Sequence, residues 1–238
     1  MDTEEQHDEP ERDRSSASAQ EAGGRSRFAR PALYAGLVLG ALLLTNAFVM
    51  QPFLIPSSSM DPTLRVGDRV LVNKLAYRFG DGPQRGDVIV FDGTDSFSAD
   101  ADPDTNSVTT ALRKAGAATG LVPPAETDYV KRVIGVGGDL VRCCDRRGRI
   151  EVNGRPVSED YLHPGDAPST VPFETRVPEG RLWVMGDHRD KSSDSRDHLG
   201  DPGGGTVPVD RVIGRGDWIG WPLGRVGSLP AGADGDDD

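Results

Sequence analysis

The sequence predicts a mostly β domain that is preceded by a single transmembrane helix. Short segments rich in Val and Ile, bounded by Gly, Pro or Asp, recur between residues 68 and 220. The 238 residues are only 36% hydrophobic and include 30 glycines and 18 prolines, which favours a loop-rich β structure over a helical bundle. One uncharged run, residues 31–50, stands apart near the N-terminus.

This run, "PALYAGLVLGALLLTNAFVM", has the length of a membrane span. Twenty residues of helix cover about 30 Å, the thickness of the hydrocarbon core of a bilayer. Arg25, Arg27 and Arg30 precede the run, and the next basic residue is Arg65. The positive-inside rule therefore places the N-terminus in the cytoplasm and the rest of the chain outside. A cleavable signal peptide would have a shorter apolar region and a small-x-small site, which "VMQPF" lacks, so we expect an uncleaved, single-pass anchor in the cell membrane.

Most of the charge lies at the two ends. The net charge is −11, and the acidic segments 1–22 and 231–238 account for nearly all of it. The remainder is close to neutral and has no broad basic face, so we expect no nucleic-acid partner. Acidic ends of this kind are typical of disordered tails. We divide the chain into a disordered cytoplasmic tail that ends in a basic flank (1–30), the transmembrane helix (31–50), an extracytoplasmic domain (51–228) and a second disordered acidic tail (229–238).

Six segments of the extracytoplasmic part have the composition of short strands. They are residues 68–77, 86–93, 128–136, 149–157, 181–187 and 210–220. In the fourth segment the pair Asn153-Gly154 suits a tight hairpin. Residues 94–127 are rich in Ala, Asp, Ser, Thr and Gly and predict a variable insertion with a short helix near 109–118.

The only two cysteines, Cys143 and Cys144, are adjacent. A zinc site needs four ligands at wider spacing, so the pair predicts no metal site, and we expect no cofactor. Neighbouring cysteines bridge each other only through a strained ring, because a peptide unit is short for a disulfide. We expect a small structural role for the pair, and its redox state stays open.

Hydrolysis of an amide needs a nucleophile, a base and donors for the oxyanion. No local pattern marks any histidine of the chain as a base, although a triad assembled from distant segments stays open. The histidines are His7, His163, His188 and His198. Lys131 differs because it lies within the apolar strand pattern "DYVKRVIGV", where alternation places it on one face with Tyr129 and Val133.

Two interpretations of Lys131 are possible. Burial would depress the pKa of its amine, and a neutral amine near pH 7 needs a shift of about 3 units, or roughly 4 kcal/mol. Alternatively, the aliphatic stem packs on the sheet while the amine reaches water.

Five blocks of sequence, taken in order, resemble bacterial type I signal peptidases. They are "PFLIPSSSMDPTL", "VGDRVLVNKLAY", "RGDVIVF", "DYVKRVIGVGGD" and "MGDHRDKSSDSR". The resemblance covers nearly all of residues 50–226 and implies a membrane-anchored serine–lysine endopeptidase that removes signal peptides from exported preproteins. It also implies a catalytic domain of antiparallel sheets that faces out from the membrane.

Carried over by position, the resemblance makes Ser59 the nucleophile and Lys131 the general base. It assigns the oxyanion hole to the hydroxyl of Ser57 and the backbone N–H of Ser59, and the orientation of the lysine amine to Ser192. Ser58 receives no role. The family lines its shallow pockets for small side chains at positions held here by Phe53, Ile55, Pro56, Met60, Leu64, Tyr129 and Val130. It supports its active-site loops with charged residues at Asp187, Arg189, Asp190, Asp194 and Arg196.

The sequence departs from the family at His188 and Lys191, which stand where asparagine is frequent. Lys191 either is solvated or, if it points inward, lowers the pKa of Lys131 further. Trp218 and Trp221 suit either a membrane interface or ordinary core packing. Ser59 follows Met50 by nine residues, so that it lies within about 30 Å of the membrane face.

Two other classes of protein share some of these features. A self-cleaving serine–lysine protease of the repressor type shares the dyad but carries a DNA-binding helix-turn-helix, which has no counterpart here. A catalytically inactive envelope protein that binds exported chains would not need Ser57, Ser59, Lys131 and Ser192 together. We therefore expect a monomeric signal peptidase whose partners are exported preproteins and membrane lipid.

Overall fold

The computed structural model describes residues 26–80, 82–94, 96–97 and 127–229. By its contacts the chain divides into two compact units, residues 1–42 and 43–238. The expectations for the N-terminal tail up to residue 25, for the helix near 109–118 and for residues 230–238 fall outside the described residues.

The first element is helix α1, Ser26–Phe48, which includes most of the predicted span. Its residues 26–30 belong to the stretch expected to be a tail, and Met50 belongs to the first strand. On the helix, Leu33, Tyr34, Leu37, Val38 and Leu39 are 59–66% exposed. Within the described ranges, no helix combines the length and the apolar character needed to cross a membrane.

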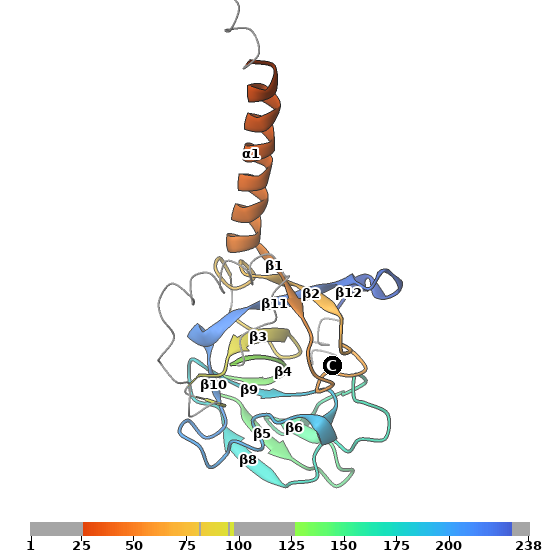
Figure 1. Cartoon of the computed structure of the whole chain (residues 1–238). Helices are drawn as coiled ribbons and strands as arrows, with labels where there is room; N and C mark the ends of the chain where they lie inside the picture. The colour runs from red at the N-terminus through yellow and green to blue at the C-terminus, as the bar shows by residue number, and fades with distance from the viewer. Residues whose placement is uncertain (1–25, 81, 95, 98–126, 230–238) are drawn as a thin grey trace, which may run out of the picture. The chain divides into compact units, whose positions relative to one another are not determined.

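The rest of the described chain is mostly β, and every strand pairing is antiparallel, as predicted. The large sheet has the strand order β1-β2-β11-β3-β4-β9-β10, and β12 pairs with β11 (Figure 1). Its strands are β1 (Met50–Leu54), β2 (Arg69–Asn73), β3 (Val88–Asp92), β4 (Asp128–Val136), β9 (Arg181–Met185), β10 (Val207–Pro208), β11 (Val212–Trp221) and β12 (Gly227–Ser228). Strand β4 therefore lies inside the sheet, between β3 and β9.

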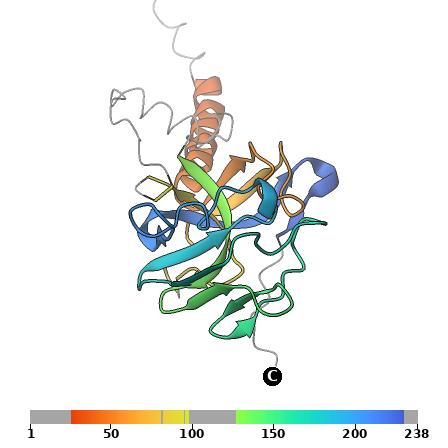
Figure 2. The same cartoon turned by 90° about the horizontal axis from the view of Figure 1, so that it is seen from below.

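The small sheet has the strand order β7-β6-β5-β8. Its strands are β5 (Leu140–Cys143), β6 (Ile150–Val152), β7 (Arg155–Pro156) and β8 (Phe173–Arg176). Both views place this sheet at the end of the domain away from β1 and β2 (Figures 1 and 2). The turn between β6 and β7 is the predicted tight hairpin, with φ of 54° at Asn153 and 78° at Gly154, which suits an Asn-Gly turn.

Three short 3₁₀ helices complete the described structure: η1 (Arg189–Lys191), η2 (Val209–Arg211) and η3 (Leu223–Arg225). In η3 the guanidinium of Arg225 donates to the Asp68 carboxylate at 2.9 Å and to the backbone oxygen of Thr63 at 3.1 Å. The end of the domain is thereby bonded to the segment that follows the three serines.

Three apolar clusters form the core. The first contains Phe53, Ile55, Met60 and Leu64, packed on β2, β3 and β11. The second joins the two sheets, because it contains residues of β5, β6 and β8 together with Trp183 and Met185 of β9. The third surrounds Ile89, Phe91 and Val133. The faces of β3 and β4 are thus covered on both sides, which leaves a polar side chain in these strands little access to water.

Candidate active site

The three serines form a turn directly after β1. Apolar residues on each side fix the turn in the core, since Ile55 is 2% exposed and Met60 is 1% exposed. The backbone N–H of Ile55 donates to Asp68 at 2.9 Å, and the N–H of Gly67 returns a bond to Ile55 at 3.0 Å. Ser59 itself is buried, and its carbonyl oxygen accepts the backbone N–H of His188 at 3.0 Å.

Lys131 lies at the middle of β4 and reaches this turn. Its residue partner on β3 is Ile89, and the side chain is 4% exposed. The amine Nζ donates a hydrogen bond to Ser59 Oγ at 2.9 Å. Of the two sequence-based interpretations, the structure selects the buried lysine.

Burial lowers the pKa of Lys131 to about 8. The carboxylates of Asp194 and Asp187 oppose this shift, and the guanidinium of Arg196 adds to it. A substantial fraction of the amine is therefore neutral at a mildly alkaline pH, and a neutral amine 2.9 Å from a hydroxyl can accept its proton.

The other two serines of the turn differ in surroundings. Ser57 is exposed, and its Oγ lies 3.3 Å from Ser59 Oγ. Ser58 is half-buried between them. The hydroxyl of Ser57 is thus close enough to Ser59 Oγ to donate a hydrogen bond to a group bound there. No side chain in the described ranges forms a hydrogen bond with Ser58.

Ser192 and the Ser59 carbonyl oxygen both lie close to Gly186. Ser192 is buried, and its Oγ has no hydrogen-bond partner among the described residues. A Cβ atom at Gly186 would lie 2.5 Å from both Ser192 Cβ and the carbonyl oxygen of Ser59. Glycine at position 186 is therefore what allows these two serine segments to come together, a role that sequence reasoning did not assign.

A buried ion pair between Arg132 and Asp187 lies next to the Ser59 segment. Asp187 is 0% exposed and accepts two bonds from Arg132, at 2.9 and 2.7 Å. Thr63 Oγ1 also donates to Asp187, at 2.5 Å, and the guanidinium carbon of Arg132 lies 4.0 Å above the centre of the Tyr161 ring. Asp187 therefore connects β4 to the segment that carries Ser59.

Two more charged residues hold the segment after β9. Asp194 accepts the backbone N–H of Gly186 at 3.0 Å and pairs with Arg196 at 2.8 Å. Arg189 donates to the Gly186 oxygen at 2.9 Å and to Glu159 at 2.5 Å. Each charged residue therefore fixes backbone or carboxylate groups around Gly186.

The chain matches a known protein family over most of its length. The family model described as "Signal peptidase, peptidase S26" matches residues 29–221. The chain belongs to the signal peptidase family. It is 42% identical over 226 residues to the "Probable signal peptidase I" of Mycobacterium leprae, covering 83% of this chain and 78% of that protein. It is 46% identical over 212 residues to the "Signal peptidase I" of Mycobacterium tuberculosis strain H37Rv, covering 80% and 71%.

Among solved structures, the chain is similar to a signal peptidase I from Enterococcus faecalis V583. The sequence identity is 25%, the TM-score is 0.35, and the match covers 56% of this chain and 95% of that one.

The residues expected to line substrate pockets of the signal peptidase domain lie at different depths. Phe53, Ile55, Met60 and Leu64 are at most 5% exposed and belong to the first core cluster. Pro56 is exposed, and Tyr129 and Val130 are half-buried. The last three are therefore the more accessible members of the set.

Three further residues singled out in the sequence lie at the surface of the signal peptidase domain. Lys191 is exposed, which agrees with its solvated interpretation. Trp218 and Trp221 are 50% and 52% exposed, which excludes ordinary core packing for either.

One histidine cluster has the composition of a metal site. Ligand atoms of His163, Asp166 and His188 lie within 4.8 Å of one another. The two imidazole rings are stacked at 3.8 Å with an interplanar angle of 9°. Lone pairs in parallel planes do not converge on one ion, and His188 Nδ1 instead forms a hydrogen bond with Asp166 at 2.8 Å. The cluster therefore suits a histidine–carboxylate contact beside the segment that carries Ser59.

Proposed function

We propose that this protein is a membrane-anchored endopeptidase that cleaves signal peptides from exported preproteins after small residues. Ser59 is the nucleophile and Lys131 the general base. The observation that carries the proposal is the buried contact of 2.9 Å between Lys131 Nζ and Ser59 Oγ, in a chain that belongs to the signal peptidase family.

The reaction begins with a neutral Lys131. Its lone pair takes the proton of Ser59 as Oγ attacks the carbonyl carbon of the scissile bond. The negative charge that develops on the substrate oxygen is stabilised by the backbone N–H of Ser59 and the hydroxyl of Ser57. Lys131 then returns the proton to the leaving amine. Neutral Lys131 then takes a proton from a water molecule as the water oxygen attacks the acyl carbon. The bond from that carbon to Ser59 Oγ breaks, and Oγ takes the proton from Lys131.

Ser192 is proposed to orient the amine of Lys131. A buried hydroxyl without a partner is costly, so its Oγ favours a nearby polar group. A neutral partner holds the lysine in place without raising its pKa, whereas an ionised carboxylate would raise it. The closeness of Ser192 to Gly186 and to the Ser59 carbonyl supports this role.

Selectivity for small side chains is proposed to come from shallow apolar pockets near Ser59. Pro56, Tyr129 and Val130 would contact the substrate, and Ile55, Met60 and Leu64 would form the apolar floor beneath them. A shallow floor of buried side chains admits Ala and rejects larger residues by steric overlap.

Helix α1 is proposed as the single-pass anchor, with the N-terminus cytoplasmic and the catalytic domain outside the cell membrane. The apolar side chains of Leu33, Leu37 and Val38 are about as exposed as those of Trp218 and Trp221. Lipid would cover the helix, and the two tryptophans suit the interface layer. The anchor would confine Ser59 to the membrane that holds the substrate, which raises its local concentration.

The test uses the full-length protein in detergent micelles with a preprotein that carries an Ala-x-Ala site. We expect cleavage at that site, and loss of at least about a thousandfold in kcat for Ser59→Ala and for Lys131→Met. Lys191→Met is the matched control and should cleave normally, because Lys191 is exposed. Unimpaired cleavage by either dyad variant would refute the mechanism.

The same assay separates the other functions. Binding of the preprotein without cleavage by the unaltered chain would identify an inactive binding protein. Cleavage confined to the chain itself would identify a self-cleaving protease.

A further inference from the structure

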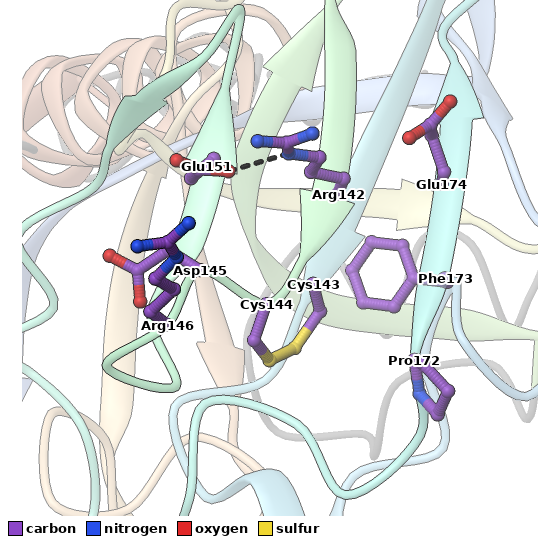
Figure 3. A pocket seen from close by; sticks show the side chains of 9 residues that line it. All are labelled: Arg142, Cys143, Cys144, Asp145, Arg146, Glu151, Pro172, Phe173 and Glu174. Carbon is purple, nitrogen blue, oxygen red and sulfur yellow. Dashed lines mark hydrogen bonds and ion pairs between the residues drawn. A yellow bond between two sulfur atoms is a disulfide. The ribbon is translucent and has the colours of Figure 1, made fainter.

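The adjacent cysteines lie in a hollow of the small sheet, and neither takes part in the proposed reaction. Cys143 and Cys144 are joined by a disulfide. They line an open hollow of about 690 Å³ together with Arg142, Arg146, Phe173 and Glu174. Figure 3 shows the two sulfurs between Arg146 on one side and the Phe173 ring on the other.

The two cysteines differ in access. Cys143 is 7% exposed and belongs to the core cluster that contains Ile150 and Phe173. Cys144 lies one residue beyond the end of β5 and is exposed. Both cysteines line the hollow, and Cys144 is the more accessible of the two to a reagent there.

The bond contributes little to the stability of the fold by the usual route. A disulfide stabilises a protein mainly by closing a long loop in the unfolded chain, and a bond between neighbours closes none. The strands already hold Cys143 in place, because it pairs with Ile150 on β6 and with Phe173 on β8. The small sheet can therefore keep its structure when the bond opens.

The hollow is lined by charged side chains of both signs. Arg142 forms an ion pair with Glu151 at 2.5 Å, and Arg149 pairs with Asp145 at 2.8 Å. Arg146 is exposed and forms no ion pair with any described residue. Its guanidinium places a positive charge two residues from Cys144 that attracts an approaching thiolate, and the Glu174 carboxylate lines the same hollow.

We propose that Cys143–Cys144 is a reversible thiol–disulfide exchange site for thiols and dithiols that enter this hollow. The thiolate of the reagent attacks Cys144 Sγ, the sulfur–sulfur bond breaks, and Cys143 leaves as a thiolate that takes up a proton. A second thiolate of the reagent attacks the mixed disulfide and releases Cys144 as a thiol. The reagent loses two electrons and two protons, and the two cysteines gain them.

The test is a redox titration of the native, full-length protein without any peptidase readout. The protein is equilibrated without oxygen in buffers with graded ratios of reduced to oxidised dithiothreitol. Acid then stops the exchange, N-ethylmaleimide alkylates the free thiols, and mass spectrometry measures the mass of the labelled protein. We expect one two-electron transition between species with no label and with two labels, with an unchanged circular dichroism spectrum. Reoxidation should restore the unlabelled species.

Two results would overturn the proposal. In one, the pair stays unlabelled in excess reduced dithiothreitol and opens only in denaturant, which would make it an inert structural bond. In the other, two labels appear at every ratio, including fully oxidised dithiothreitol, which would mean that no bond forms.

A pair of single variants tests the direction of attack. Cys143→Ser leaves the exposed thiol of Cys144, and Cys144→Ser leaves the buried thiol of Cys143. At matched pH we expect the first variant to react with a disulfide reagent at least about tenfold faster than the second, because thiol exchange requires access. Equal rates, or faster reaction of Cys143, would contradict the assignment of Cys144 as the attacked sulfur.

Discussion

Lys131 Nζ lies 2.9 Å from Ser59 Oγ, although the two residues are 72 positions apart in the chain. The lysine is held in a central strand, and the serine is held by a turn whose flanking side chains are in the core. Both groups are therefore positioned by rigid elements before any substrate binds, which reduces the reorganisation needed for proton transfer.

The pH dependence of cleavage should follow the amine of Lys131. Because its pKa is lowered to about 8, kcat/KM should rise about tenfold per pH unit below that value and level off above it. A series of initial rates from pH 6 to pH 10 measures this limb. If the limb instead disappeared on replacement of His163 or His188, a histidine would be the base.

The same lowered pKa makes stability depend on pH. Between pH 8 and pH 10.5 the unfolded chain binds a proton at Lys131 that the native protein does not. The free energy of unfolding should therefore rise with pH across this window, by about 3 kcal/mol from this group. The measurement is chemical unfolding at several pH values, and Lys131→Met should lack this contribution. An equal pH dependence in both proteins would show that the amine is charged in the native state.

Removal of the Ser57 hydroxyl should affect the transition state more than substrate binding. We expect Ser57→Ala to lower kcat about a hundredfold with little change in KM, because it deletes one oxyanion donor. Ser58→Ala is the matched control on the neighbouring residue and should be nearly silent. Equal effects of the two variants would show that Ser57 has no particular role.

Gly186→Ala should damage both the fold and the activity. Its methyl group would lie 2.5 Å from Ser192 Cβ and from the Ser59 carbonyl oxygen, so that backbone must move. Gly200→Ala is the control, since no atom lies within 4 Å of a Cβ at that position. Thermal unfolding and kcat should both fall for the first variant only, and normal values for Gly186→Ala would refute the close approach.

Asp187→Asn should leave the guanidinium of Arg132 buried without its counter-charge. Loss of one partner of a buried pair costs about 3–5 kcal/mol, and kcat should fall because Thr63 and the segment after Ser59 lose an anchor. The pair of Arg142 and Glu151, in which the arginine side chain is 47% exposed, offers a control, and Glu151→Gln should cost less than about 1 kcal/mol. Similar losses in the two variants would argue against a supporting role for Asp187.

Much of the fold could be predicted from local pattern. Strand β4 has the predicted bounds, and β2, β3, β9 and most of β11 lie within predicted segments. Strands β3 and β4 have dense Val and Ile because they are covered on both faces. Strands β5 and β8 were not predicted, since Arg142 and Glu174 interrupt them on their open face. Strand β1 continues the apolar run of the helix and contains Pro52, so that no boundary marks it.

The site could be predicted less completely. Position within the family motifs indicated Ser59 and Lys131. Periodicity alone left two interpretations of Lys131 open, a buried amine and an amine that reaches water. Contacts across the fold left no local signal: the bonds of Thr63 and Arg132 to Asp187 join three distant segments. The one sequence signal for this contact was Arg132 directly after Lys131 in an apolar strand pattern, because a buried guanidinium requires a carboxylate partner. The close approach of Ser192 and the Ser59 carbonyl at Gly186 arises from tertiary packing and has no signature in the sequence.

The two bonds of Arg225 have a practical consequence for shortened forms of the protein. Its guanidinium holds both the Asp68 carboxylate and the backbone of Thr63, and Thr63 in turn holds Asp187. A soluble version for crystallisation or inhibitor screening that stopped before position 225 would remove a support of the turn that carries Ser59. The C-terminal boundary therefore has to be chosen by this contact and placed beyond the last strand, β12.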